Sequence, residues 1–414
     1  MTLHDFASPT DAERIASAKA SEGVFTKLMA DEFLQSAGRD GPLHNKVLSV
    51  KDLFDIKGQT TRAGSPILAN VKPASKDATA VELLRTAGAR VIGRTTMTEL
   101  AYSGLGLNPH DGTPENPLFS RCIPGGSTSG GAVSVATGLA DIALGSDTGG
   151  SLRIPAAFCG LVGFKPTQAS VSMSGAVPLS ESLDSVGPMA RDVTTCAISW
   201  QVMAKRPVAT IAKQRPKLII PQNFGLTDLD PAITAGFAEL RETLKTKGWE
   251  LRDVTLPVLE DYGTLPVWQF SAYESLRRFG DKLGEHGAHM DPRVRQRMER
   301  GREISETVFA TTLSQRAELI ASFRAEIDDA IVLLPTVAIQ PPHFDDVATD
   351  DGFSKLNLLA LRNTSLANVM DGCSISIPYG RGEALMGAML TSFGGQDETI
   401  FGAALAMESD LGNG

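Results

Sequence analysis

The sequence GGSTSGG at residues 125–131 is followed, after a short predicted helix, by GSDTGGSLRIP at residues 145–155. In each stretch a serine, Ser127 or Ser151, directly follows a pair of glycines. Because glycine has no side chain, a substrate carbonyl can approach the backbone there, and successive N–H groups can point at one spot. One Gly-Gly-Ser alone would be a plain glycine turn. Ser127 and Ser151 are therefore candidates for a catalytic site, and the family resemblance described below decides between the two interpretations.

Strand and helix signals alternate on both sides of these motifs. The apolar runs predict strands, the helical spacing predicts helices, and Gly88 is a typical helix end. The expected elements are a strand at 48–52, a helix at 80–87, a strand at 89–93, a helix of small residues at 130–139 and a strand at 142–145. Such alternation predicts an α/β fold with a mixed, mostly parallel central sheet covered by helices on both faces.

The rest of the chain continues this pattern without an internal repeat or an obvious linker. The expected helices lie at 10–37, 193–205, 231–247 and 398–408, with a long charged helical region at 258–330. The expected strands lie at 161–167, 217–221, 249–256, 330–335 and 374–378. We therefore predict a single domain over residues 1–414.

Composition excludes several classes of function. The net charge of −9 argues against a nucleic-acid partner, which needs a basic face. No apolar stretch is long enough for a membrane span, so we expect a cytoplasmic protein. The six histidines and four cysteines show no metal-ligand spacing, so neither a metal nor another cofactor is expected. The cysteines are expected to be reduced and buried.

With the upstream sequence KDLF at 51–54, the two serine motifs resemble the amidase signature family. That family consists of serine hydrolases with a Ser–Ser–Lys triad, in which one serine follows a cis peptide bond. The resemblance implies hydrolysis of a C–N amide bond. It is densest over about 48–190, the signature core, and weakest over 206–330, so that 258–330 is expected to be a variable helical cover.

The resemblance implies one role for each triad residue. Ser151 is the expected nucleophile, Ser127 the expected proton relay and Lys51 the expected base. An ordinary lysine has a pKa of ~10.4 and cannot serve as a base at neutral pH, but burial would lower this value. The apolar neighbours of Lys51 suit a buried strand end. The alternative is a surface lysine that pairs with Asp52.

The residues around the nucleophile are expected to support it. Backbone N–H groups of Thr148, Gly149 and Gly150, together with that of Ser151, could form the oxyanion hole. Asp147 and Arg153 are expected to hold the loop through an ion pair or hydrogen bonds and to take no part in catalysis. Two residues depart from the family pattern at a turn expected beside the substrate, where a Gly-Lys-Thr-Asn start is commoner: Arg94 and Thr96.

The resulting prediction is an amidase that hydrolyses a small linear carboxamide to a carboxylate and ammonia or an amine. One alternative is the glutaminase-type subunit of an amidotransferase, which would pass ammonia to a partner. Another is a catalytically dead binding protein on the same fold. A small-molecule amide is the expected partner, with no nucleic acid and no membrane. A homodimer and the identity of the amide stay open.

An arginine cluster at 277–302 offers the one hint about the substrate. These arginines lie in the region expected to cover the pocket of an otherwise acidic protein. They would suit a substrate with an anionic group, because an arginine fork matches a carboxylate at two points. The alternative is a solvated helical face whose arginines pair with Glu299, Glu303 and Glu306.

Overall fold

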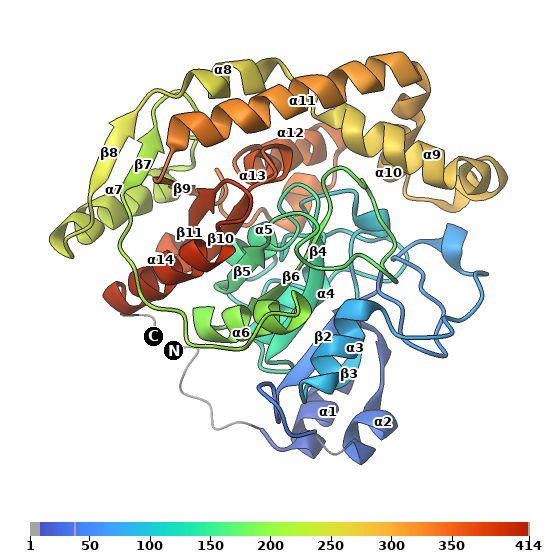
Figure 1. Cartoon of the computed structure of the whole chain (residues 1–414). Coiled ribbons are helices and arrows are strands. Elements are labelled where there is room, and N and C mark those ends of the chain that lie inside the picture. The colour runs from blue at the N-terminus through green and yellow to red at the C-terminus, as the bar shows by residue number, and fades with distance from the viewer. Residues whose placement is uncertain (1–8, 37–38, 413–414) are drawn as a thin grey trace.

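One continuous eleven-stranded sheet forms the centre of the molecule (Figure 1). The computed structural model describes residues 9–36 and 39–412. In spatial order the strands are β1 (Phe25–Leu28), β3 (Arg90–Thr95), β2 (Val47–Lys51), β4 (Ile142–Asp147), β6 (Ser185–Ala190), β5 (Val162–Lys165), β10 (Cys373–Tyr379), β11 (Met386–Ser392), β9 (Ile331–Pro335), β7 (Leu218–Pro221) and β8 (Leu251–Val254).

The sheet is mixed, as expected, but it is not mostly parallel. Parallel pairing is confined to β3-β2-β4 and to β9-β7-β8. The other neighbours, which run from β4 through β6, β5, β10 and β11 to β9 and include β1 with β3, are antiparallel. The prediction of a mostly parallel sheet was wrong because two of the antiparallel strands, β6 and β11, were not predicted from the sequence.

Helices cover both faces of the sheet, which confirms the predicted α/β architecture. The helices that flank the sheet or extend beyond it are α1 (Asp11–Ala20), α2 (Ala30–Gln35), α3 (Thr79–Thr86), α4 (Ser129–Ala136), α5 (Arg153–Cys159), α6 (Val193–Met203), α7 (Pro231–Thr246), α12 (Asp350–Arg362), α13 (Ser365–Val369) and α14 (Asp397–Asp410). Helices α3, α6 and α14 pack together on one face, and α4 and α5 pack on the other.

Alternation along β2 decides where Lys51 points. Leu48 and Val50 belong to the apolar cluster on the α3 and α6 face. The residues between them face the other way, since successive strand side chains point to opposite faces. Ser49 accordingly bonds Ser134 of α4 at 2.8 Å. Lys51 therefore lies on the face that α4 covers, next to the start of that helix.

A group of helices between residues 257 and 327 lies over one end of the sheet and is called the helical cover below. Its helices are α8 (Pro257–Thr264), α9 (Trp268–His286), α10 (Pro292–Glu299) and α11 (Glu306–Ile327), and they run along the top of Figure 1. Apolar residues on α8, α9 and α11 pack into one cluster that also includes Leu334 of β9. The cover is therefore anchored to the sheet by a core of its own.

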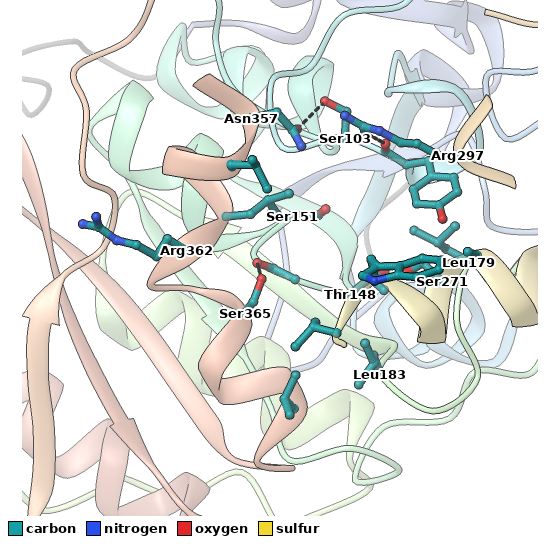
Figure 2. Close-up of a pocket in the computed structure, with 18 of the residues that line it drawn as sticks. Ser103, Thr148, Ser151, Leu179, Leu183, Ser271, Arg297, Asn357, Arg362 and Ser365 are labelled. Carbon is teal, nitrogen blue, oxygen red and sulfur yellow. Dashed lines mark hydrogen bonds between the residues drawn. The ribbon is translucent and has the colours of Figure 1, made fainter. Parts of the chain in front are cut away.

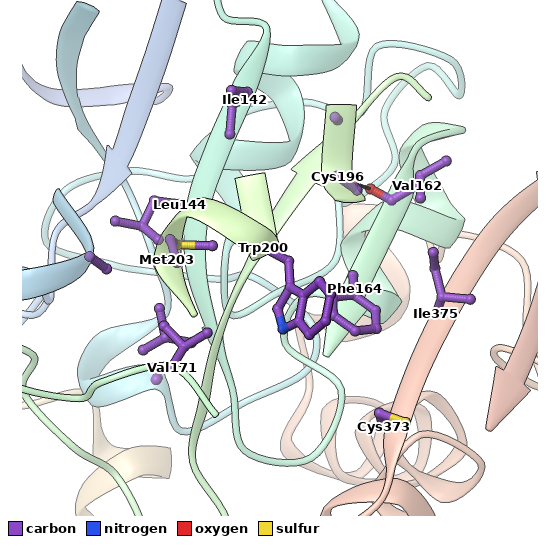
Figure 3. Close-up of a cluster of buried hydrophobic side chains, with 14 of the residues drawn as sticks. Ile142, Leu144, Val162, Phe164, Val171, Cys196, Trp200, Met203, Cys373 and Ile375 are labelled. Atoms are coloured by element: carbon purple, nitrogen blue, oxygen red, sulfur yellow. Dashed lines mark hydrogen bonds between the residues drawn. The ribbon is translucent and has the colours of Figure 1, made fainter. Parts of the chain in front are cut away.

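The largest core cluster lies on the α6 and α14 face (Figure 3). Phe164 of β5 packs against Phe401 of α14 and Trp200 of α6, with ring centroids 4.2 and 6.0 Å apart. Cys196 and Cys373 are part of this cluster. All four cysteines are buried and free, as expected.

The predicted helix over residues 10–37 is wrong in its middle. Residues 37 and 38 lie outside the described residues, and in the remainder β1 separates α1 from α2. Gly23, at φ +67°, lies in the left-handed region in the short turn between α1 and β1. Phe25 and Lys27 then pair with β3. Pairing with a distant strand overrides the local helical pattern here.

Candidate active site

Lys51, at the end of β2, is completely buried and bonded to two serines. Its Nζ donates to Ser127 Oγ at 2.8 Å and to Ser146 Oγ at 3.0 Å. Burial lowers the pKa of Lys51 from 10.5 to about 7, although the charges of Asp147 and Asp184 act in the opposite direction. A lysine in this state is a base at neutral pH.

Asp52 does not pair with Lys51, so the interpretation of Lys51 as a surface lysine is wrong. The Asp52 carboxylate instead accepts a hydrogen bond from Arg94 Nε at 2.6 Å, and both side chains are buried. Arg94 therefore has a structural role between β2 and β3. Neither Arg94 nor Thr96 lines the cavity described below.

Ser127 lies two residues before the start of α4 and is completely buried. The peptide bond between Gly126 and Ser127 is cis. Gly126 has no room for a side chain, because an added Cβ would lie 2.6 Å from Gly106 Cα. The Ser127 carbonyl accepts a hydrogen bond from the Thr98 N–H at 3.1 Å, which fixes the backbone on the other side.

Ser151 lies in the turn between β4 and α5 and lines a cavity of about 460 Å³. Within the described part of the chain, its hydroxyl makes no hydrogen bond, and none joins it to Ser127. The structure thus joins Lys51 to Ser127 directly and leaves the Ser151 hydroxyl facing the cavity. Figure 2 shows Ser151 near the middle of the labelled side chains.

Only part of the predicted oxyanion hole is available. The Gly150 N–H donates to Asp147 Oδ1 at 2.8 Å, so this amide is not free to bind a substrate oxygen, and the expectation for Gly150 is wrong. The N–H groups of Thr148, Gly149 and Ser151 make no hydrogen bond to any residue that the structure describes. Those three amides are the donors left in the loop.

Asp147 and Arg153 form the expected ion pair, with Arg153 Nη2 2.9 Å from Asp147 Oδ1 and both side chains fully buried. Asn368 of α13 donates to the same oxygen at 3.0 Å and accepts from Arg153. Burial alone would raise the pKa of the Asp147 carboxyl, but the charge and hydrogen bonds of Arg153 hold it below its ordinary value. The pair fixes the turn that carries Ser151.

Helix α13 and the residue before it hold the loop from the other side, which the sequence did not reveal. Thr364 Oγ1 donates to the Gly149 carbonyl at 2.6 Å, and Ser365 Oγ donates to it at 3.3 Å. Gly150 has φ +138°, and a Cβ on it would lie 2.2 Å from Thr364 Oγ1. The glycine pair signalled a close approach, but not that residues more than 200 positions away would make it.

Asp184 is a second residue that sequence reasoning missed. Its carboxylate is buried and accepts hydrogen bonds from Thr148 Oγ1 at 2.6 Å and from the Leu179 N–H at 2.9 Å. Burial raises the pKa of Asp184 to about 7, against the effect of these hydrogen bonds. No spacing or motif in the sequence singled out this residue. Asp184 connects the turn of Ser151 to a wall of the cavity, because Leu179 lines it.

The cavity extends from Ser151 to the helical cover. Its walls come from the loop at 101–103, from α9, α10 and α12, and from the loop that holds Leu179. Among the arginines of the 277–302 cluster, only Arg297 and Arg300 line it. Four of the others pair with carboxylates: Arg277 with Glu306, Arg278 with Glu181, Arg293 with Asp350 and Arg295 with Glu299.

Neither a metal-binding cluster nor a membrane-spanning helix is found among the residues that the structure describes. No group of three or more His, Cys, Asp or Glu side chains there could hold a metal ion. In the same part of the chain, none of the helices combines the length and the apolar character that crossing a bilayer requires.

Comparison with known proteins identifies the family. The family model described as Amidase matches residues 25–401. The chain is 32% identical to 2-amino-5-chloromuconic acid deaminase of Comamonas testosteroni, over 93% of this chain and 86% of that protein. It is also 32% identical to Amidase 1 of Arabidopsis thaliana, over 88% and 92%. A crystal structure of an amidase has a TM-score of 0.86 and 29% identity, and covers 97% of this chain and 94% of that chain. This chain therefore belongs to the amidase signature family.

Proposed function

We propose that this protein hydrolyses the C–N bond of a small linear carboxamide through an acyl-enzyme on Ser151, with Ser127 as proton relay and Lys51 as base. The observation that carries the proposal is the hydrogen bond from the buried Lys51 to Ser127, 2.8 Å long, beside a cavity lined by Ser151. A fully buried lysine with a pKa of about 7 has the property that a base needs.

In the first step, neutral Lys51 takes the Ser127 proton, and Ser127 takes the proton of Ser151. The Ser151 oxygen attacks the amide carbonyl. The oxyanion that forms would accept hydrogen bonds from the free N–H groups of Thr148, Gly149 and Ser151. Such preorganised donors typically account for about 3–4 kcal/mol each in serine hydrolases.

The second half returns the protons. The proton on Lys51 passes back through Ser127 to the leaving nitrogen, the C–N bond breaks, and ammonia or an amine departs. Water then attacks the Ser151 ester and gives its proton to the same relay. The ester C–O bond breaks, and Ser151 regains its hydrogen as the carboxylate product leaves. Each proton taken is returned, so no cofactor is required.

The experiment is an active-site assignment. Ser151→Ala should remain folded and lose nearly all turnover of carboxamides. After treatment with a fluorophosphonate, the mass of the peptide containing Ser151 should rise by one phosphonyl group. An adduct on Ser127 instead would overturn the assignment of the nucleophile. No adduct and no turnover with any amide would favour a catalytically dead binding protein.

The amidotransferase alternative uses the same groups but a different acceptor for ammonia. The isolated chain should release free ammonia from a carboxamide at its full rate if it is an amidase. An ammonia-transfer activity that appears only after a co-purified subunit is added would favour the alternative. The two functions are therefore separated by measuring ammonia with the purified chain alone.

A further inference from the structure

The cavity beside Ser151 is positively charged, although the whole chain carries a net charge of −9. Three arginines line it, Arg297, Arg300 and Arg362, and none of the described residues that line it is Asp or Glu. A cavity of one charge sign with apolar walls concentrates ligands of the opposite charge. The three arginines are not equivalent, and their contacts decide which one is available to a ligand.

Arg297 of α10 has a guanidinium with donors to spare. Its Nη1 donates to the Tyr102 carbonyl at 2.6 Å, while its other nitrogens make no hydrogen bond to a described residue. No described carboxylate lies within ion-pair distance of it. Burial lowers the pKa of Arg297, although Tyr102 and Asp291 act in the opposite direction. The charge is therefore partly desolvated and has no counter-ion, which is unfavourable without a bound anion.

The neighbouring arginine on the same helix shows the contrast. Arg293 lies one turn before Arg297, and its Nε pairs with Asp350 at 2.9 Å outside the cavity. From the sequence alone, each of these two arginines could either contact the substrate or lie on a solvated helical face. The structure assigns the second role to Arg293. Arg297 lines the cavity without a carboxylate partner, and its guanidinium lies 5.1 Å from the ring centre of Phe353 and 5.9 Å from that of Tyr102.

The other two cavity arginines already have partners or lie at the edge. Arg300 is exposed, and its guanidinium stacks 3.9 Å from the ring centre of Trp268. Arg362 donates to the Gly225 carbonyl at 3.2 Å, and Figure 2 shows its head directed away from Ser151. In the same view the head of Arg297 lies beside Ser103. Arg297 is thus the arginine best placed to bind part of a substrate.

Most of the remaining wall is apolar. It comes from the cover helices and from the loops at either side of Ser151. The apolar lining residues include Leu179, Leu183, Phe224, Val267, Trp268 and Leu361. A volume of about 460 Å³ is in the range of pockets that hold a small organic molecule. The walls suit an aliphatic or aromatic body between the reacting amide and the charged end.

We propose that Arg297 binds a carboxylate of the substrate, which is an amide with an apolar body and an acid group separate from the scissile C–N bond. The free edge of its guanidinium would meet the carboxylate at two points, as arginine forks do. The inference rests on the proposed function and adds the substrate class. Tyr102 holds the guanidinium by its carbonyl, so Tyr102 is the positioning residue of this subsite.

The test compares monoamides of linear dicarboxylic acids, from malonamate to suberamate, with neutral alkyl amides of equal chain length. We expect the best acid to exceed its neutral counterpart in kcat/KM by about 30-fold or more, the usual effect of a charge-assisted pair. Linear alkanoates should likewise compete with substrate, whereas the corresponding alcohols should not. Competition gives a readout that does not depend on the position of the amide.

Variants of two arginines on α10 make the test specific. Arg297→Gln should lower kcat/KM for the acid by about 30-fold and change the neutral amide by less than about 3-fold. Arg297→Lys, which keeps the charge but not the fork, should retain an intermediate preference. Arg293→Gln is the matched control and should leave the preference unchanged. Melting temperatures would verify that all three variants fold.

Two outcomes would overturn the inference while leaving the amidase proposal intact. One is hydrolysis of neutral amides with no preference for the acid. The other is an equal loss of both substrates in Arg297→Gln, which would mean that Arg297 acts only by holding Tyr102. Failure of the amidase proposal looks different, because then neither substrate is hydrolysed and no fluorophosphonate adduct forms on Ser151.

Discussion

Lys51 Nζ lies 2.8 Å from Ser127 Oγ, and neither side chain is exposed to solvent. The β2 strand delivers Lys51, and the backbone before α4 delivers Ser127. Because the lysine is desolvated, its pKa falls to about 7, and it can accept a proton at neutral pH. The burial of Lys51 therefore supports its proposed role as the base that takes the proton of Ser127.

Replacing Lys51 by arginine tests whether Lys51 acts as a base or only contributes a positive charge. Arginine stays protonated in proteins and cannot accept a proton. We expect Lys51→Arg to lose about 10²–10⁴-fold in kcat, almost as much as Lys51→Ala. Initial rates of ammonia release would measure this. If Lys51→Arg kept more than about a tenth of wild-type activity, the lysine would act only by charge or packing.

The same residue should leave a signature in the pH dependence of stability. The pKa of Lys51 is lowered from 10.5 to about 7 by folding, so between these values the unfolded chain binds one more proton. Stability due to Lys51 should therefore rise with pH from about 7 to about 10 and be lowest below pH 7. Denaturant unfolding should show a steeper rise in wild type than in Lys51→Met, in which, among the described lysines, only the buried Lys165, whose pKa is lowered to about 8, still contributes a rise of this kind. Parallel pH curves for the two proteins would contradict it.

Asp184 should influence the pKa of Lys51 through its charge, without contacting Lys51 directly. Its charge raises the pKa of Lys51, so removing that charge should lower this pKa further. We expect Asp184→Asn to shift the acidic limb of the kcat/KM profile to lower pH. The maximal rate should also fall, because Leu179 and Ser180 lose an acceptor for their N–H groups. An unshifted limb with a reduced maximum would reduce Asp184 to a structural role.

Gly150 should tolerate no side chain. It has φ +138°, and an added Cβ would overlap Thr364 Oγ1 at 2.2 Å. We expect Gly150→Ala to cost about 3 kcal/mol or more in the free energy of unfolding. Gly138 is the matched control, since it has φ +76° but no atom within 4 Å of an added Cβ. Gly138→Ala should cost only about 1–2 kcal/mol. Equal losses would mean that backbone conformation alone decides the effect.

The sequence predicted the burial of Lys51 and the ion pair of Asp147 with Arg153, because their signals are local. Glycine pairs, a lysine at a strand end and an Asp-to-Arg spacing within one turn can all be recognised in a few residues. The buried Lys51 and the pair of Asp147 with Arg153 are where these signals placed them.

The features that were missed depend on contacts between distant parts of the chain. Strands β6 and β11 pair with β4 and β9, which are distant in the sequence. Their antiparallel pairing therefore could not be predicted from the local sequence. Asp147 takes the Gly150 amide, which no motif indicates. Thr364 reaches Gly149 across 215 positions. Arg293 and Arg297 looked alike until the fold placed Asp350 beside only one of them.

An acyl-enzyme on Ser151 should be open to nucleophiles other than water. A serine ester partitions between water and any better nucleophile that reaches it, and the Ser151 turn opens into the cavity. Adding hydroxylamine should therefore yield a hydroxamate together with the acid, and the ratio should rise with hydroxylamine concentration. Ammonia release should hold or increase, because acylation precedes the partition. A mechanism in which water attacks the amide directly, with Ser151 only orienting it, predicts no enzyme-dependent hydroxamate.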